Sequence, residues 1–344
     1  MRILVDILHP AHVHFFRNFA GEMRGRGHDV VITARSKDHS LDLLDAYGLS
    51  YRHLSTQGEG RRRKPSELIT HTRRLMSVMR EFRPDVMTGI MGPAIAVAGK
   101  LRGVPAVVFY DTEFAVQTNR FVYPLAHSVV TPDCYQGRVR GRHVTYAGYH
   151  ELAYLHPNRF EPDPARLAAF GVSPSEPYTL VRFVSWQATH DKHERGLTAA
   201  QKQELVSLLG AYGRVLVSSE APLPDHLKAL ELHGPRHDVH HVMAFAQSIV
   251  GESATMASEA AVLGVPAVFI ATTGRGYTDD EEARYRLVRH ITDDEFDKAV
   301  AVINETLSGA PREFGRAARA RLLDEKIDVT AWMVDYFESQ FPGA

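Results

Sequence analysis

The segment Gly251–Pro266, G-E-S-A-T-M-A-S-E-A-A-V-L-G-V-P, decides the fold of the second half of the chain. It follows a short apolar run, Ser248–Val250, and precedes another, Ala267–Ile270. This pattern predicts the turn and helix of a strand–helix–strand unit. Gly264 is expected to end the helix at a positive φ, and Pro266 prevents its continuation.

The start of this predicted helix is built from small residues, including Gly251, Ser253 and Thr255. They allow a ligand to approach backbone N–H groups that have no partner within the helix, where the helix dipole is positive, so they favour a phosphate site. Glu259 comes four residues after Thr255, on the same helical face, where a carboxylate could bind the two hydroxyls of a ribose. The pattern therefore predicts a nucleotide, although small residues suit the first turn of any strand–helix–strand unit.

An earlier segment, Gly92–Tyr110, aligns without a gap with Ser253–Ala271 and shares the block G-V-P-A-V. Two similar units indicate two similar α/β halves. The earlier copy has Ala98 at the position of Glu259. The shared scaffold does not need the carboxylate, which favours a functional role for it.

The composition describes a globular protein, with 44% hydrophobic and 24% charged residues among 344. A net charge of −1 gives no overall attraction to nucleic acid, so any anion site must be local. The single cysteine, Cys134, excludes an internal disulfide framework. The opening M-R-I-L-V-D-I is typical of a strand and not of a secretory leader, and charges interrupt the apolar runs, so we expect a cytoplasmic protein.

The loop L-H-P-A-H-V-H connects a predicted strand, Arg2–Ile7, to a predicted helix from about residue 13 to 26. It holds His9, His12 and His14 at the carboxyl edge of a parallel sheet, where open α/β proteins bind ligands. They are candidates for substrate binding or proton transfer, or they simply fill a polar loop. No metal site is predicted, because no carboxylate or cysteine completes a ligand set.

Asp111 and Glu113 directly follow another predicted strand, with Asn119 and Arg120 just beyond. Carboxylates at a strand exit are candidates for general acid or base catalysis. Capping of a helix would explain one of them equally well.

Four consecutive cations, Arg61–Lys64, lie in a glycine-flanked loop. Such a run is usually a solvated loop, but it could also meet a phosphate-bearing acceptor or an anionic membrane. Peripheral contact with a membrane or a lipid-linked acceptor therefore stays open.

The pattern predicts an N-terminal Rossmann-like domain at 1–155, a proline-rich linker at 156–177, and a C-terminal Rossmann-like, nucleotide-binding domain at 178–325. A last helix within 326–344 is expected to pack back on the first domain. In the second domain, Ser185 and His190 lie in a strand-exit loop on the side of Gly251. Thr278 and Glu281 have the spacing of a capping box, and Arg275 is expected to be free to reach a diphosphate.

Two Rossmann-like halves, a proline-rich linker and a nucleotide motif in the second half resemble the GT-B glycosyltransferases. This resemblance implies two doubly wound parallel-sheet domains that face each other across a cleft. The segments I-L-V-D-I-L-H-P-A-H-V-H-F-F-R-N-F, R-G-H-D-V-V-I-T-A-R and G-E-S-A-T-M-A-S-E-A-A-V-L-G-V-P are similar to a prokaryotic family of uncharacterised glycosyltransferase-like proteins.

A more distant resemblance is to the non-hydrolysing UDP-N-acetylglucosamine 2-epimerases. Glu113 matches the first glutamate of that family, 119–120 its Asn-Arg pair, His190 its loop histidine and Glu259 its ribose-binding glutamate. However, residues 116–118 replace its glutamate pair, and its Gly-Asp-Thr aspartate is also missing. Epimerisation moves a proton at C2 and needs several carboxylates, too few of which are in place here.

These resemblances favour a metal-independent glycosyltransferase that uses a nucleotide-sugar, most simply a UDP-sugar, as substrate and needs no cofactor. The donor is expected to contact Gly251, Ser253, Thr255, Glu259, Arg275, Ser185 and His190. An unknown acceptor is expected to contact His9, His14, Asn119 and Arg120, with Asp111, Glu113 and His12 as catalytic candidates. The alternatives are a nucleotide-sugar 2-epimerase or hydrolase, and a GT-B-like binding protein without catalysis.

Overall fold

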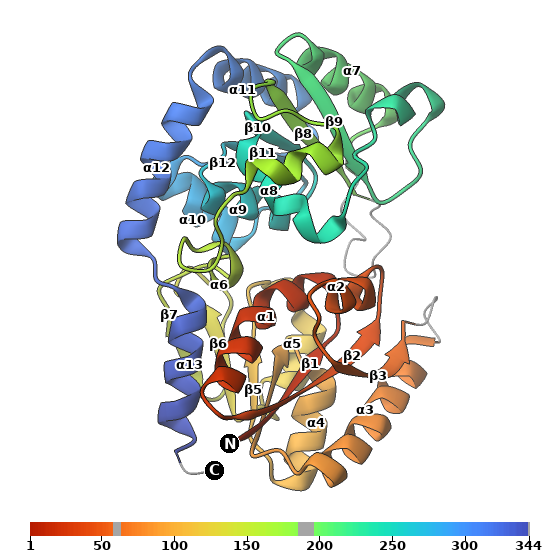
Figure 1. Ribbon diagram of the computed structural model, residues 1–344, viewed down its shortest axis with the longest axis vertical. Coiled ribbons are helices and arrows are strands. Elements are labelled where there is room, and N and C mark those ends of the chain that lie inside the picture. The colour runs from red at the N-terminus through yellow and green to blue at the C-terminus, as the bar shows by residue number, and fades with distance from the viewer. Residues whose placement is uncertain (58–62, 185–195, 343–344) are drawn as a thin grey trace. The chain divides into compact units, whose positions relative to one another are not determined.

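The computed structural model describes residues 1–57, 63–184 and 196–342, and the chain divides into two compact units. Unit 1 comprises Met1–Arg159 and Ile327–Ala344, and unit 2 comprises Phe160–Lys326. The chain therefore enters unit 2 within the proline-rich segment 156–177 and returns to unit 1 just before its last helix (Figure 1).

Unit 1 contains a seven-stranded sheet in the order β3-β2-β1-β4-β5-β6-β7, and every pair of neighbours is parallel. The strands are β1 (Arg2–Ile7), β2 (Asp29–Ser36), β3 (Tyr51–Thr56), β4 (Val86–Ile90), β5 (Ala106–Phe109), β6 (Ser128–Pro132) and β7 (His143–Tyr146). Every residue of β4 and β5 is buried, as expected for strands covered on both faces of a parallel sheet.

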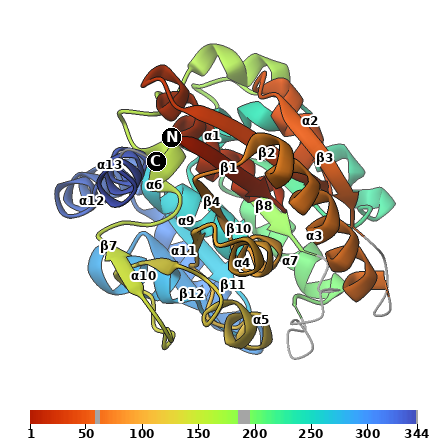
Figure 2. The ribbon, with the colours of Figure 1, turned by 90° about the horizontal axis from the view of Figure 1, so that it is seen from below.

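The helices of unit 1 are α1 (Pro10–Gly25), α2 (Ser40–Ala46), α3 (Arg63–Phe82), α4 (Pro93–Arg102), α5 (Val116–Val122), α6 (Leu152–Leu155) and α13 (Val329–Gln340). Helix α3 lies along β3 (Figure 2), and its Arg74 donates a hydrogen bond to the carbonyl of Leu54. Helix α13 comes from the end of the chain and lies against α1, with the rings of Phe19 and Phe337 4.9 Å apart (Figure 1).

Unit 2 contains a five-stranded parallel sheet in the order β12-β11-β10-β8-β9. Its strands are β8 (Tyr178–Phe183), β9 (Arg214–Ser219), β10 (Ser248–Gly251), β11 (Ala267–Ile270) and β12 (Val288–Ile291). Its helices are α7 (Ala199–Gly210), α8 (Val239–Phe245), α9 (Ala254–Leu263), α10 (Gly276–Tyr285), α11 (Phe296–Ser308) and α12 (Pro311–Glu325), with 3-10 turns at Pro164–Phe170, Asp225–Leu230 and Arg236–Asp238.

In each sheet the strand order reverses once, and this places the loops that can bind ligands. Strand β1 lies between β2 and β4, and β8 lies between β9 and β10. Loops at such a switch point diverge to opposite faces of the sheet and leave room for a ligand at its carboxyl edge. In unit 1 these are the loops after β1 and β4, and in unit 2 those after β8 and β10.

The aligned segments of the two halves fold alike. Each holds a helix, α4 or α9, followed by a strand, β5 or β11. Gly103 and Gly264 end the two helices at φ values of 70° and 77°. The predicted stop at Gly264 is confirmed, because glycine adopts this left-handed conformation without steric cost.

The predicted capping box of Thr278 with Glu281 is wrong. Helix α10 begins one turn earlier, so Arg275 is the N-cap and Thr278 is the third helical residue. The Thr278 hydroxyl accepts the N–H of Arg275 over 3.0 Å. Glu281 lies deeper in the helix and is completely buried, where its carboxyl accepts a hydrogen bond from Ser258 over 2.6 Å.

Candidate functional site

The turn between β10 and α9 requires glycine at its first position. Gly251 has φ 151°, and a Cβ there would lie 2.1 Å from the carbonyl oxygen of Arg182 in the neighbouring strand. Ser253 caps α9, and its hydroxyl accepts the N–H of Met256 over 3.3 Å. With Thr255, which is half-buried, these residues place the positive end of α9 at the switch point of the unit 2 sheet.

Glu259 lies one turn beyond Thr255 and is only 6% exposed. Its Oε1 lies 2.9 Å from Nε2 of His240, a buried residue of α8. Burying a carboxylate is costly unless a partner compensates it, and His240 is that partner. The sequence did not indicate His240, since helix α8 precedes the nucleotide motif and carries no motif of its own.

Glu252 has an anchoring role that the sequence did not reveal. Its two carboxylate oxygens accept the backbone N–H groups of Val184 and Leu197 over 3.0 and 2.7 Å, and Lys202 lies 3.2 Å away. Glu252 therefore holds both described ends of the connection that follows β8. Two predicted donor residues, Ser185 and His190, lie outside the described residues.

Arg275 is not free, contrary to the expectation from the sequence. Its Nη1 donates to the carbonyl oxygens of Thr273 and Gly274 and to the Thr273 hydroxyl, over 2.9 to 3.0 Å. Its guanidinium is thus folded back on its own loop.

In unit 1, the loop after β1 presents two histidines as hydrogen-bond donors. The N–H groups of Leu8 and Ala11 donate to Nδ1 of His12 and His9 over 3.3 and 3.2 Å. A ring nitrogen that accepts carries no proton, so each neutral ring holds its proton on Nε2. Burial and then nearby positive charges lower the pKa of both rings, to about 3 for His9. Both imidazoles are therefore neutral donors at physiological pH.

Asp111 follows β5 and is held as an ionised carboxylate. Its Oδ2 lies 2.9 Å from Nδ1 of His150, and its Oδ1 accepts the Thr112 hydroxyl over 3.0 Å. Burial alone would raise the pKa of Asp111, but the charge and hydrogen bond of His150, the Thr112 hydroxyl and the nearby His12 lower it to about 2. The Asp111 side chain is 25% exposed, so a ligand can still reach it.

His150 lies in the loop after β7 and positions Asp111. Its ring packs against Phe15, with centroids 4.4 Å apart, and is stacked parallel to Tyr146. Its Nε2 is buried and makes no hydrogen bond within the described part of the chain. The sequence analysis did not identify His150, because it is far from Asp111 along the chain and no motif connects them.

His14 does not join the other two histidines. Its ring stacks on Tyr154 at 5.4 Å, and its Nδ1 lies 3.2 Å from the Tyr47 hydroxyl. It is 7% exposed and belongs to the packing of α1. Its predicted contact with an acceptor therefore has no support from its position.

Glu113, Asn119 and Arg120 line a hollow of about 480 Å³ in unit 1. Glu113 and Asp111 have different partners. Oε1 of Glu113 accepts the backbone N–H of Gln136 over 3.1 Å, whereas the partner of Asp111 is His150. The structure brings together Glu113, Asn119 and Arg120, and separately Asp111, His9 and His12.

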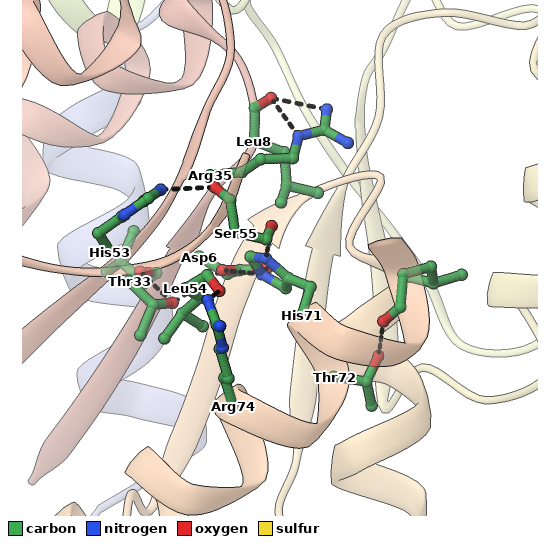
Figure 3. A network of polar contacts seen from close by, with 12 residues as sticks. Asp6, Leu8, Thr33, Arg35, His53, Leu54, Ser55, His71, Thr72 and Arg74 are labelled. Atoms are coloured by element: carbon green, nitrogen blue, oxygen red, sulfur yellow. Dashed lines mark hydrogen bonds and ion pairs between the residues drawn. The ribbon is translucent and has the colours of Figure 1, made fainter. Parts of the chain in front are cut away.

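A buried polar network lies beneath the histidine loop (Figure 3). Asp6, inside β1, accepts the Thr33 hydroxyl over 2.7 Å and faces Nε2 of His71 at 3.0 Å. Burial alone would lower the pKa of His71, but the charge and hydrogen bond of Asp6 outweigh it and raise that pKa above 6.5. His71 and Asp6 therefore form a buried acid–base pair.

The same network reaches the histidine loop through Arg35. The Ser55 hydroxyl lies 2.8 Å from Nδ1 of His71 and donates to Glu67 over 2.5 Å. Arg35 lies 3.5 Å from Glu67. It also donates twice to the carbonyl of Leu8, over 3.3 and 2.8 Å (Figure 3). Because two N–H groups of the Arg35 guanidinium donate to the same carbonyl oxygen, Arg35 fixes the backbone that carries His9 and His12.

Within 1–57, 63–184 and 196–342, no three or more histidine, cysteine or acidic side chains are grouped so that they could hold a metal ion. No helix there is both long and apolar enough to cross a membrane. The basic run Arg61–Lys64 lies outside the residues whose side chains are described.

Three solved structures are similar to the chain over nearly its whole length. UDP-GlcNAc 2-epimerase from Neisseria meningitidis, bound to UDP-GlcNAc, has a TM-score of 0.67 at 10% identity, covering 99% of this chain and 100% of that one. The spinosyn rhamnosyltransferase SpnG has a TM-score of 0.62 at 14% identity, covering 98% and 100%. MurG from Acinetobacter baumannii has a TM-score of 0.58 at 15% identity, covering 98% and 100%.

The chain has the GT-B fold. The predicted class of two doubly wound parallel-sheet domains is therefore confirmed. At sequence level, residues 1–149 match the model of a family described as Protein of unknown function (DUF354). No curated protein matches the sequence significantly. At these low identities the GT-B fold is shown, and the activity has to be argued from the site.

Proposed function

We propose that the protein transfers a sugar from a nucleotide-sugar, a UDP-sugar in the simplest case, to a hydroxyl-bearing acceptor. The start of α9 carries this proposal. Gly251 and Ser253 form a tight turn at the switch point of the unit 2 sheet, and a buried carboxylate, Glu259, follows one turn later. The same small-residue turn at α4 has no such carboxylate.

The donor would bind to unit 2 with its diphosphate at the N-terminus of α9. Backbone N–H groups and the helix dipole there would stabilise the negative charge of the departing nucleoside diphosphate without a metal ion. Glu259 would accept the ribose hydroxyls, while the contact with His240 orients its carboxylate.

The acceptor would bind to unit 1, with Asp111 as the base. The acceptor oxygen bonds to the anomeric carbon as the bond from that carbon to the diphosphate breaks, and the hydroxyl proton moves to Asp111. A carboxylate with a pKa of about 2 is a weak base. It suffices if the proton moves late, when the attacking oxygen already carries positive charge. The Nε2–H groups of His9 and His12 would donate hydrogen bonds to substrate oxygens.

The donor assignment is tested by thermal unfolding of the full chain with UDP, GDP, CMP and dTDP. A ligand at 100 times its dissociation constant stabilises the native state by about 2.7 kcal/mol, which is a shift of several degrees. One nucleotide is expected to shift the wild type selectively. Glu259→Gln should lose that shift, although glutamine keeps an acceptor toward His240.

Glu313→Gln is the matched control, because Glu313 is an exposed residue of α12 in the same unit. The control should keep the full shift. If Glu259→Gln kept it as well, the donor assignment would fail.

Incubation with the donor alone then separates transfer from its alternative. A 2-epimer or free nucleotide formed without any acceptor would indicate a nucleotide-sugar epimerase or hydrolase. A transferase should leave the donor nearly unchanged. If nucleotide bound but Asp111→Asn left the cellular function of the protein unaltered, a binding protein without catalysis would be the better description.

A further inference from the structure

The hollow in unit 1 lies among the loop after β5, helix α5 and the segment after β6. Its volume is about 480 Å³. It is lined by Glu113, Val116, Asn119, Arg120, Tyr123, Pro124, Tyr135, Gly137, Arg138 and Arg140. Its lining contains two sets of polar groups that a ligand could bind, buried acceptors and exposed arginines.

The first kind is a pair of buried acceptors. Oε2 of Glu113 and Oδ1 of Asn119 are inaccessible to solvent and have no hydrogen-bond partner among the described residues. Asn119 is 7% exposed, and its amide nitrogen makes only long contacts, 3.4 Å to the carbonyl of Glu113 and 3.5 Å to the Tyr135 hydroxyl. Unsatisfied buried acceptors are costly, and ligand hydroxyl groups would satisfy them.

The second kind is a set of arginines, Arg120, Arg138 and Arg140. All three are exposed, and no carboxylate of the described residues pairs with them. With one carboxylate among them, they give the hollow a formal charge of +2. A phosphate monoester carries about −1.5 to −2 at pH 7, and guanidinium groups bind phosphate oxygens in pairs.

We propose that this hollow binds a phosphate whose neighbouring carbons carry hydroxyl groups, as in a sugar phosphate or the headgroup of a sugar- or inositol-bearing lipid. The arginines would hold the phosphate, and Glu113 and Asn119 would accept the hydroxyls. Tyr123 and Tyr135, whose hydroxyls are 2.7 Å apart, form an aromatic wall for the ring. That this ligand is the acceptor rests on the proposed function, whereas the binding itself does not.

The first test is calorimetric titration of the full chain with glucose 1-phosphate, inorganic phosphate and glucose, without nucleotide. Glucose 1-phosphate should bind about tenfold more tightly than phosphate, because two further hydrogen bonds form, and glucose alone should not bind measurably. Equal affinity for glucose 1-phosphate and phosphate would overturn the hydroxyl part of the proposal. If neither glucose 1-phosphate nor phosphate binds, only a lipid headgroup remains as the ligand, and vesicles that also fail to bind would overturn the whole proposal.

Variants separate the two kinds of group. Arg138→Gln with Arg140→Gln should weaken both anions about tenfold or more, whereas the control Arg102→Gln, exposed at the end of α4, should not. Glu113→Ala should reduce the preference for glucose 1-phosphate to about threefold, because one of the two hydrogen bonds is lost. It should leave phosphate affinity unchanged or higher, because a negative charge is lost. A loss of both affinities in Glu113→Ala, with the circular dichroism spectrum unchanged, would contradict the assignment.

Sedimentation with vesicles identifies the source of the ligand. Phe114, Val116 and Phe121 near the hollow are 46, 66 and 50% exposed, which suits contact with a bilayer surface. Binding to vesicles of phosphatidylcholine with phosphatidylinositol, but not to phosphatidylcholine alone, would indicate a lipid headgroup, provided that Arg138→Gln with Arg140→Gln abolishes it. Binding of glucose 1-phosphate without such vesicle binding would indicate a soluble ligand.

The tests of the two proposals fail separately. If none of UDP, GDP, CMP and dTDP shifts the unfolding temperature but glucose 1-phosphate binds, the hollow is a site and the transferase proposal falls. If UDP binds through Glu259 but neither glucose 1-phosphate nor vesicles bind, the donor site stands and the hollow is not a site of this chemistry.

Discussion

Replacement of Asp111 by asparagine is expected to lower the free energy of unfolding of unit 1 by about 2 kcal/mol at pH 7. The pKa of Asp111 lies at about 2 in the folded protein against an ordinary value of 3.8, chiefly because His150 opposes the effect of burial. Each pKa unit corresponds to about 1.4 kcal/mol. With the side chain only 25% exposed, solvent screening removes little of this stabilisation.

The pH dependence provides the sharper test. A depressed carboxyl pKa stabilises the fold fully above the pKa of the unfolded state, and this stabilisation is lost as the pH falls through the folded pKa. The difference between wild type and Asp111→Asn should therefore be largest above pH 5 and about half as large near pH 3.

Urea unfolding can be followed in unit 1 through Trp332 of α13, because the sequence contains only two tryptophans. A Trp186→Phe background makes Trp332 the single reporter. Asp335→Asn serves as the control, since Asp335 is an exposed residue of the same helix, and it should leave stability unchanged. Equal stability of Asp111→Asn and wild type at pH 7, or a difference that does not shrink in acid, would refute the reasoning about the His150 contact.

Three further substitutions test other parts of the two units. Gly251→Ala should destabilise unit 2 by at least about 1–3 kcal/mol in thermal unfolding, because a Cβ would lie 2.1 Å from a backbone carbonyl oxygen, whereas Gly210→Ala, with open space around it, should not. Burial raises the pKa of Glu281 from 4.5 to about 8, so the wild type loses stability as the pH rises from 4.5 to 8. Glu281→Gln should therefore be more stable than the wild type, by less than about 1 kcal/mol at pH 5 and by a few kcal/mol at pH 8. A difference in stability that does not change with pH would contradict this. His71→Leu should cost about 3–5 kcal/mol in urea unfolding of unit 1, because it leaves the buried carboxyl of Asp6 without its histidine partner, and a variant as stable as the wild type would contradict this.

Most elements of the fold could be predicted because their signals are local. The strand predicted at Arg2–Ile7 is β1, and the helix predicted from about residue 13 to 26 is α1, Pro10–Gly25. Burial periodicity and the conformational limits of glycine act within a few residues, so the chain itself carries them. The prediction that Thr278 caps α10 was wrong for a local reason too, since a threonine can serve equally as the N-cap or as the third helical residue.

The candidate sites were predictable only in part. Sequence reasoning selected Asp111, Glu113 and Glu259 as carboxylates at strand exits and helix starts. It did not identify His150 and His240, which lie 2.9 Å from Asp111 and Glu259. A charged group inside an apolar strand, such as Asp6 in β1, was the one available signal that a buried partner must exist, and it does not say which residue is that partner.

The sequence by itself determined the two parallel-sheet units, the turn at Gly251 and the set of candidate carboxylates, because backbone sterics and burial patterns are properties of short segments. Tertiary structure decided which groups are paired. In the folded chain, Arg275 donates to its own loop and His14 packs within the core around α1. Oε2 of Glu113 and Oδ1 of Asn119 accept no hydrogen bond from the described residues. The charge state and availability of a side chain depend on what lies within about 4 Å of it, and only folding brings residues distant in sequence to that distance.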